Sequence, residues 1–286
     1  MNTEVQTKDW DLEISSNQGW FKWNLKELWK YRDLLLLLVK RDYKASFRQT
    51  ILGPIWFFVQ PIFTTFVYTF VFNRVAQIGT ESQPPILFYL SGIILWNYFS
   101  TCLLGTSNAF VSNANIFGKV YFPRLIIPIS IVISNLMRFG VQFSFFLFCY
   151  LYYITTKNYD PQLSWHILLT PFLILLMAIL GLSIGMFVST FTTKYRDLQY
   201  LLNFGIQLLM YATPIVYPAS AVKGKLSAIL LLNPMTGIIE GFKFAFLGCG
   251  QWNWMMISYS AIFGILLLAV SFELFARVEK GFMDTV

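Results

Sequence analysis

Polar side chains recur at helical spacing within three otherwise apolar segments of the chain. Intervals of three or four residues place the members of each stripe on one face of a helix. The stripes are Gln60, Thr64 and Tyr68 in segment 52–72; Ser134, Arg138 and Gln142 in segment 125–153; and Tyr200, Asn203, Gln207 and Tyr211 in segment 198–217. Polar groups in hydrocarbon either bond to neighbouring helices or face a polar pathway. Both interpretations stay open for any single stripe, and three stripes together favour a pathway.

Arg138 is the strongest single candidate among these residues. It lies deep in an apolar run, where an unpaired charge costs several kcal/mol. A partner or a water-filled path must therefore compensate its charge, and the sequence does not identify that partner.

Residue types and motifs that the sequence lacks exclude several classes of function. No Asp or Glu lies in the interior of a predicted span, although ion- and proton-coupled transporters commonly place carboxylates at mid-membrane. No G-x-x-x-x-G-K-[ST] phosphate loop occurs, and one histidine with three scattered cysteines offers no catalytic or metal-binding set. The sequence therefore predicts no enzyme and no cofactor or metal bound by this chain. Any energy source must lie on another polypeptide.

The composition is typical of a protein whose solvent is lipid. Of the 286 residues, 56% are hydrophobic and 12% are charged, against about 25% charged in soluble domains. A soluble fold of this size would expose large apolar patches. The net charge of +7 comes mostly from the N-terminal segment and short loops, which fits topology signals and lipid headgroups better than nucleic acid.

Six apolar stretches approach the length of about 20 residues that a membrane-spanning helix needs. They are 52–72, 86–105, 125–153, 167–190, 198–217 and 256–274. The sequence therefore predicts an all-α integral membrane protein with six transmembrane helices. In the fourth stretch, Gly181 and Gly185 form a small-residue strip that favours close helix packing.

The segment before the first span predicts an amphipathic helix. Leu25, Leu28 and Trp29 follow helical spacing among basic residues, and the apolar run 34–39 is too short to cross a bilayer. We expect this helix to lie in the membrane interface; a soluble helix packed on another domain is the alternative. The predicted organisation is an N-terminal segment, 1–50, a permease domain, 51–275, and a cytoplasmic tail, 276–286.

Basic residues predict the orientation of the spans. Nine lysines and arginines precede residue 50, and Lys119, Arg124, Lys194 and Arg196 fall on the same predicted side. The opposite side holds only Arg74, Lys157, Lys223, Lys225 and Lys243, so the positive-inside rule predicts that both termini are cytoplasmic.

The connection between the fifth and sixth spans holds two apolar pieces that are too short to cross a membrane. They are 226–232 and 236–247, separated by Asn233 and Pro234. We predict a re-entrant pair of short helices on the outer side, buried in protein or lining a cavity. Two surface helices are the alternative.

Several segments, in order and spacing, resemble a known family. They are LLLLLVKRDYKASFRQTILGPIWFFVQP, NANIFGKVYFPRLIIP, KYRDLQYL, TPIVYP, LNPMTGIIEGFKFAFLG and FARVEKGFMDTV. Together they are similar to the permease subunits of type-2 ABC exporters of polysaccharides, the O-antigen, capsule and teichoic-acid group of Wzm and TagG type. The resemblance runs from about Trp23 to Phe282 and does not separate members by substrate.

The resemblance implies a homodimeric channel in a bacterial inner membrane, with two nucleotide-binding ATPase subunits that hold ATP and Mg on the cytoplasmic side. It also implies that the loop 113–121 couples to the ATPase or gates the channel. The N-terminal segment would be a second contact with the ATPase, and residues 195–197 would be a third. An ordinary short loop with a positive-inside charge pair is the alternative. The coupling and gate residues would be Asn113, Ile116, Phe117, Lys119, Tyr121, Arg196 and Asp197.

Aromatic residues make up 19% of the chain, more than aromatic belts at the membrane interfaces require. Sugar C–H faces stack on aromatic rings, so aromatic side chains near the polar stripes are candidates for a glycan path. Core or lipid-facing positions are the alternative for each of them. The expected channel residues are Trp56, Gln60, Tyr68, Tyr98, Arg138, Tyr200, Asn203, Gln207 and Tyr211.

The prediction for function is export of a lipid-linked, O-antigen-like polysaccharide. The expected partners are a second copy of the chain, the two ATPase subunits, membrane lipids and the polysaccharide, with no nucleic acid. An exporter of drugs, lipids or antibiotics with the same membrane plan is one alternative. An ATP-independent channel or scaffold is the other.

Overall fold

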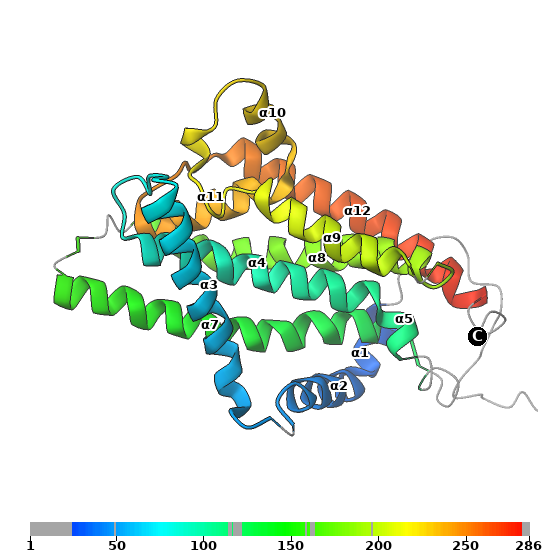
Figure 1. Ribbon diagram of the computed structural model, residues 1–286. Coiled ribbons are helices and arrows are strands. Elements are labelled where there is room, and N and C mark those ends of the chain that lie inside the picture. Colours follow the sequence, from blue (N-terminus) through cyan, green and yellow to red (C-terminus); the bar gives the residue numbers. More distant parts are fainter. Residues whose placement is uncertain are drawn as a thin grey trace, which may run out of the picture.

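The computed structural model of the chain describes residues 25–48, 50–113, 116, 122–157, 159–160, 164–195 and 197–281. Within these ranges the regular elements are helices and no strand occurs, which confirms the expected all-helical fold (Figure 1). Four of the predicted coupling and gate residues lie outside the described residues. They are Phe117, Lys119, Tyr121 and Arg196.

Five helical segments among the described residues are long and apolar enough to cross a membrane. They are Gly53–Val75, Pro85–Ser107, Ile126–Lys157, Trp165–Thr192 and Trp254–Arg277. These segments match five of the six expected spans. The remaining one, 198–217, is helical only over α9 (Leu198–Tyr211), which is about 21 Å long at about 1.5 Å per residue and so shorter than the hydrocarbon core. The sixth span therefore stays a prediction.

The helix α4 (Pro85–Ser107) forms the centre of the bundle. It begins with Pro85 in its first turn, where the missing N–H of proline costs nothing. Apolar side chains cover all of its faces, and it packs against α3, α7, α8, α9 and α11. A helix that is hydrophobic all round is stable only when it is enclosed, and α4 is the most buried of the five long segments.

Small residues bring α8 (Thr170–Thr192) close to α4. A Cβ atom on Gly185 would lie 2.8 Å from the carbonyl oxygen of Leu103, and one on Gly181 would lie 2.9 Å from Cβ of Cys102. Both distances are too short for real contacts, so glycine is required for this approach. The small-residue strip is thus confirmed as a packing face, and α12 (Trp254–Gly281) packs on the other side of α8.

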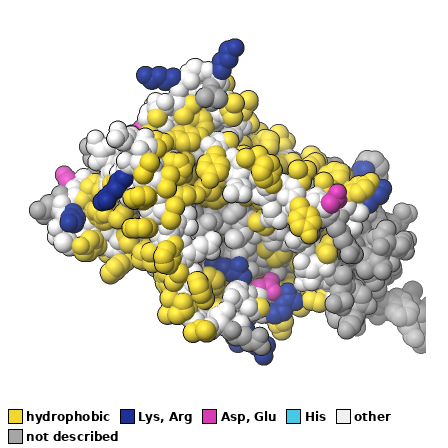
Figure 2. Space-filling view, in the orientation of Figure 1, with side chains coloured by type: hydrophobic (Ala, Val, Ile, Leu, Met, Phe, Trp, Pro, Cys, Tyr) yellow, Lys and Arg dark blue, Asp and Glu magenta, His cyan; other side chains and the backbone are white. Residues whose placement is uncertain are grey.

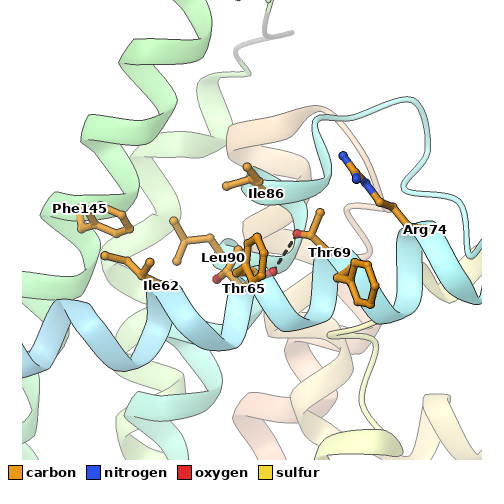
Figure 3. Close-up of a pocket in the computed structure, with 9 residues that line it drawn as sticks. Ile62, Thr65, Thr69, Arg74, Ile86, Leu90 and Phe145 are labelled. Carbon is orange, nitrogen blue, oxygen red and sulfur yellow. Dashed lines mark hydrogen bonds between the residues drawn. The ribbon is translucent and has the colours of Figure 1, made fainter.

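The helices α3 (Trp56–Tyr68) and α7 (Ile126–Lys157) complete the core on one side. The helix α3 follows a short 3-10 turn, η1 (Gly53–Ile55), and continues into a π-helical segment, η2 (Thr69–Val75). It crosses α4 and α7 steeply (Figures 1 and 3). Few of its side chains are buried within the chain, so most of its surface is available to lipid or to another protein.

The N-terminal helices α1 (Leu25–Lys30) and α2 (Arg32–Ala45) pack on the bundle where α7 begins. Leu38 of α2 is buried in a cluster with Phe110 of α5 (Ala109–Ser112) and Phe275 of α12. Leu36 and Leu37 remain exposed beside charged residues. This distribution agrees with the expected amphipathic helix, and its place in a membrane interface stays a prediction.

The two short pieces between α9 and α12 are helices, as expected. A 3-10 turn, η4 (Ala219–Ala221), leads into α10 (Lys225–Leu232), and α11 (Pro234–Leu247) follows. Asn233 separates the two helices and caps α11, because its side chain accepts a hydrogen bond from the N–H of Met235 at 3.0 Å. Gly248, in the left-handed conformation, ends α11. Most of α11 is buried, which disfavours a surface position for that piece; entry into a membrane stays a prediction.

Hydrophobic side chains dominate the outer surface over α3 and along the bundle, while basic and acidic side chains gather toward its ends and beside α2 (Figure 2). We call the end where α5 lies the α5 end and the end where α10 lies the α10 end (Figure 1). A surface of this kind is stable in contact with lipid.

Candidate functional site

A polar cavity of about 770 Å³ opens at the α5 end, between α2 and the bundle. The short helix α5 and the helices α2, α4 and α7 all contribute to its wall. The charged and amide-bearing lining residues are Arg41, Asp42, Asn108, Asn113, Asn135 and Arg138. Basic and acidic side chains lie close together beside α2 on the surface (Figure 2).

Arg138 is half-buried in this cavity, and the structure identifies its partners. Its guanidinium donates to Oδ1 of Asn135 at 3.1 Å and to the hydroxyl of Ser46 on α2. Asp42 provides the carboxylate that interacts electrostatically with it, and the ring of Phe57 lies 5.8 Å from the guanidinium carbon. The Nε–H group has no hydrogen-bond acceptor among the described residues. The Nε atom is itself buried, so one donor of the guanidinium stays without a partner in this arrangement.

A hydrogen bond joins α2 to the start of the predicted coupling loop. Nη2 of Arg41 donates to Oδ1 of Asn113 at 3.3 Å and also contacts Oδ1 of Asp42 at 2.8 Å. The amide of Asn113 is itself fixed by donation to the carbonyl oxygen of Ala109 at 3.0 Å. This hydrogen bond links α2 to Asn113, the first residue of the predicted coupling loop.

The cavity extends from the end of the bundle into the apolar region. Arg138 is twelve residues beyond Ile126, the first residue of α7, which corresponds to about 18 Å along the helix. Two guanidinium groups face one carboxylate here, so the cavity carries a net positive charge. Planar guanidinium groups with free donors bind phosphate and carboxylate groups well.

The polar stripe of α9 lies on the surface of the chain. Tyr200 is 81% exposed, and Asn203, Gln207 and Tyr211 are exposed as well. The exposed positions at the middle of α12, by contrast, are apolar: Ile262, Phe263, Ile265, Leu266 and Val270. Exposed amides are unfavourable against lipid, so the α9 surface is suited to a polar path or to protein contact.

The stripe of α3 meets α9 at one point. The hydroxyl of Tyr68 donates to Sδ of Met210 at 3.6 Å and lies near Tyr211. Trp56 and Gln60 are exposed on the same helix. Tyr98 differs from the other expected channel residues, because it is 3% exposed and packs on Phe139 in the core. In this conformation the structure places Tyr98 away from any surface of the chain.

A separate apolar groove of about 320 Å³ runs along α3 and η2 beside α4. Figure 3 shows Ile62, Leu90 and Phe145 along it, with Arg74 at its outer end and Thr69 bonded to the backbone of Thr65. The apolar lining of this groove fits a hydrocarbon chain. The groove and the polar cavity share no lining residue, so the groove does not link Arg74 to the polar cavity.

The structure describes three of the seven predicted coupling and gate residues. Asn113 and Ile116 both line the polar cavity, while Asp197 is exposed just before α9. Asp197 thus lies apart from the other two.

Sequence reasoning missed the part of the cavity that α2 supplies. The sequence predicts that Arg41, Asp42 and Ser46 belong to an N-terminal segment that contacts the ATPase, and it gives them no role in a polar site with Arg138. Asp42 and Ser46 are four residues apart, so a charge and a hydroxyl on one face of an amphipathic helix were the available signal. Asn135, one turn before Arg138, was a second signal.

Comparisons of the sequence with known proteins identify its family and relatives. The family model of the ABC-2 type transporter matches residues 33–247. An O-antigen export system permease protein RfbA of Myxococcus xanthus is 30% identical over 224 residues, which cover 78% of this chain and 83% of that protein. A Klebsiella pneumoniae protein of the same name is 27% identical over 92% of this chain and 97% of its own length. The polysialic acid transport protein KpsM of Escherichia coli is 21% identical over 87% and 94%, respectively.

Among the described residues, five long apolar helices, with a polar cavity between α2 and the bundle, define a multi-span membrane protein. With three quarters of its length matched by one family model, the chain belongs to the ABC-2 type transporter family.

Proposed function

We propose that this chain is the permease subunit of an ABC exporter that moves a lipid-linked, O-antigen-like polysaccharide across a bacterial inner membrane. The observation that carries the proposal is the net positive cavity around Arg138, which reaches into the apolar bundle. The names of the relatives, O-antigen export permeases and a polysialic acid transport protein, support a polysaccharide as the cargo.

The polar cavity receives the anionic head group of the lipid carrier. Arg41 and Arg138 supply the charge, because both line the cavity. The hydrocarbon chain of the carrier stays in lipid, because the groove along α3 and other outer surfaces of the bundle are apolar. The head group thereby enters laterally while the chain remains outside the protein.

A second copy of the chain completes the glycan path. The exposed amides Asn203 and Gln207 of α9, next to the exposed aromatic residues Tyr200 and Tyr211, offer hydrogen bonds and stacking faces to sugars. Pairing of two copies through α3 and α9 removes these amides from lipid. The short helix α9 and the turn after it then cross the membrane as the sixth span within the dimer.

Two ATPase subunits, which hold ATP and Mg, dock at the α5 end on the cytoplasmic side. The excess of basic residues near this end supports that orientation, as well as cytoplasmic termini. Movement of the loop 113–121 on docking is passed through the Arg41–Asn113 hydrogen bond to α2. The cavity around Arg138 opens or closes as α2 moves, and α10 with α11 forms the re-entrant outer end.

Deletion of the gene from its host tests the proposal. We expect polysaccharide to disappear from the cell surface, to accumulate inside as the lipid-linked form, and to return to the surface with the wild-type gene. Arg138→Gln should restore less than about a tenth of the surface polysaccharide, because it removes one of the two positive charges of the cavity. Arg138→Lys should restore part of it, because the charge remains without the fork of donors.

Lys157→Gln is the matched control, since it removes a positive charge from the opposite end of the same helix and should restore export fully. Immunoblots of surface and intracellular polysaccharide, with equal membrane levels of each variant, give the result. Normal export by Arg138→Gln would contradict the role of the cavity. Unchanged surface polysaccharide in the deletion strain, with lower tolerance of a small toxic compound, would favour the small-molecule exporter.

A further inference from the structure

A second polar cavity, of about 230 Å³, lies at the α10 end, far along the chain from the site described above. Six separate parts of the sequence meet there: the loop before α4, the turn η4, the helices α10 and α11, the turn that follows α11 and the first turn of α12. The oxygen-bearing side chains in its wall are Glu81, Ser220, Ser227, Thr236, Glu240 and Gln251.

The loop before α4 holds Glu81 in a strained backbone conformation. Gln77, Glu81 and Ser82 have φ angles of 54°, 52° and 63°, in the left-handed region that L-residues seldom adopt. The carboxylate accepts hydrogen bonds from the N–H of Gly250 at 2.8 Å and from the hydroxyl of Ser220. Backbone strain of this kind is retained where it positions a functional group.

Glu240 of α11 points its carboxylate at the same glycine. The side chain of Glu240 is 4% exposed. Among the described residues, no donor lies at hydrogen-bonding distance and angle from its Oε1. A Cβ atom added to Gly250 would lie 2.7 Å from Oε2 of Glu240, so this carboxylate closely approaches the glycine. The hydroxyl of Thr236, one turn earlier and 2% exposed, is also without a partner. Two carboxylates and a free hydroxyl therefore converge around Gly250.

The nearest positive charge is directed elsewhere. Lys243 is completely buried, and its Nζ donates to the carbonyl oxygens of Pro214 at 2.7 Å and Ile215 at 3.4 Å. The same Nζ lies 3.7 Å from the ring centre of Phe88. Lys243 thus balances at most one of the two carboxylates, and like charges that face one cavity favour either a proton or a further cation.

We propose that this cavity binds a divalent cation of the Ca²⁺ or Mg²⁺ type, between the carboxylates of Glu81 and Glu240. All of the side-chain donors are oxygen atoms, which hard cations prefer and softer metals do not. The irregular arrangement on three loops and a helix favours Ca²⁺, which tolerates variable geometry and six to eight ligands. The cavity leaves room for coordinated water.

The described residues contain no group of three or more acidic, His or Cys side chains, so two carboxylates give a site of the weak, extracellular class. Such sites bind with dissociation constants of about 10⁻⁴ to 10⁻³ M. A bound ion joins the loop before α4, the turn η4 and the turn after α11. It therefore stabilises the α10 end, and this role goes beyond the proposed transport function.

Terbium luminescence tests the site in the purified full-length protein. Tb³⁺ replaces Ca²⁺, and Trp252 is placed to transfer excitation, because it follows Gln251 and packs on Gly241 beside Glu240. We expect saturable luminescence on excitation of tryptophan, displaced by Ca²⁺ at lower concentrations than by Mg²⁺. Glu81→Gln and Glu240→Gln should each weaken Tb³⁺ binding about tenfold or more, since each removes one charged ligand.

Glu273→Gln is the matched control, because this residue pairs with Arg277 near the end of α12 and should leave Tb³⁺ binding unchanged. Thermal unfolding gives a second readout: Ca²⁺ should raise the Tm of the wild type above its value in EDTA, and it should not raise that of Glu81→Gln. If Glu240→Gln does not fold, Glu81→Gln, at a partly exposed position, still decides the test. Absence of tryptophan-sensitised luminescence in the wild type, or equal binding by Glu81→Gln and the wild type, would overturn the proposal.

Discussion

Two buried cations, Arg138 and Lys243, are stabilised in different ways. Lys243 is enclosed, with its donors directed at two carbonyl oxygens and the face of Phe88. Arg138 lies at the edge of an open polar cavity and keeps one donor without an acceptor. Lys243 therefore stabilises the packing of the bundle at the α10 end, whereas Arg138 can take part in binding a ligand in the cavity.

The charge balance around Arg138 gives a prediction with a definite sign. Asp42 is the one carboxylate among the cavity-lining residues, so Asp42→Asn should make the cavity more positive. We expect Asp42→Asn to bind a short-chain polyprenyl diphosphate a few times more tightly than the wild type, while Arg41→Gln and Arg138→Gln bind it about tenfold more weakly. Equilibrium binding to the purified protein in detergent measures this, and weaker binding by Asp42→Asn in folded protein would contradict the head-group role.

The pH dependence of the second cavity follows from Glu240. Burial raises the pKa of this carboxyl above its usual range, and Glu81 adds to the shift, while the Lys243 ammonium and the backbone around Ala219 and Gln251 oppose it. A cation binds the deprotonated form only, so its affinity is complete above the raised pKa and is lost as the pH falls through it. Cys249, whose pKa burial raises to about 12, stays neutral in this range.

We therefore expect the midpoint for loss of Tb³⁺ affinity with falling pH to lie above the value of about 4.3 for an ordinary Glu. Titrations of luminescence at several pH values measure the midpoint. A midpoint at or below that of a free glutamate would show that Glu240 does not bind the ion.

At the scale of elements, helix packing around α8 decides the stability of the bundle. Gly185 packs against Leu103 and Thr106 of α4 with no room for a Cβ atom, so Gly185→Ala should separate the two helices and lower the Tm by several degrees. Gly140 lies within α7 and has nothing within 4 Å of an added Cβ. Gly140→Ala should leave the Tm equal or higher, because alanine is the better helix former by about 1 kcal/mol. Thermal unfolding in detergent compares them, and equal Tm values would contradict the packing role.

The elements that local pattern determines were predicted well. The lengths of the apolar stretches predicted the five segments that are long enough to cross a membrane. Asn233 and Pro234 predicted the boundary between α10 and α11. Lys243 was taken for a residue of the outer loops, yet it is completely buried. Its partners Pro214 and Ile215 are almost thirty residues away, and no periodicity in one segment can reveal a contact of that kind.

The two cavities were beyond sequence reasoning for the same reason. Arg138 meets Ser46 across 92 positions, and Glu81 meets Gly250 across 169. The position of Glu81 also depends on left-handed backbone angles in a loop without glycine at those sites, which residue preferences do not indicate. The Arg138 stripe predicted a polar site, and only tertiary structure could supply its other wall.

At the scale of the whole molecule, the chain leaves polar groups exposed on one side of the bundle. The helix α9 exposes Asn203 and Gln207, while the middle of α12 exposes apolar residues alone. If two copies pair through α3 and α9, Gln207→Cys in a background without native cysteines should be joined into covalent dimers by a short bifunctional maleimide in native membranes. Ile265→Cys on α12 is the control and should remain monomeric on denaturing gels. The reverse pattern would contradict pairing through α9.

Purification of the chain from native membranes under gentle extraction tests the central claim most directly, when the ATPase activity of the product is measured. The proposed function predicts a stable complex with a separate subunit that carries a phosphate-binding loop, and ATP hydrolysis that responds to added lipid-linked polysaccharide. In that complex, Arg138→Gln should keep the partner and lose most of the response, since it alters the cavity and leaves the docking surface intact. A chain that purifies without an ATPase and moves substrate without ATP would contradict the account.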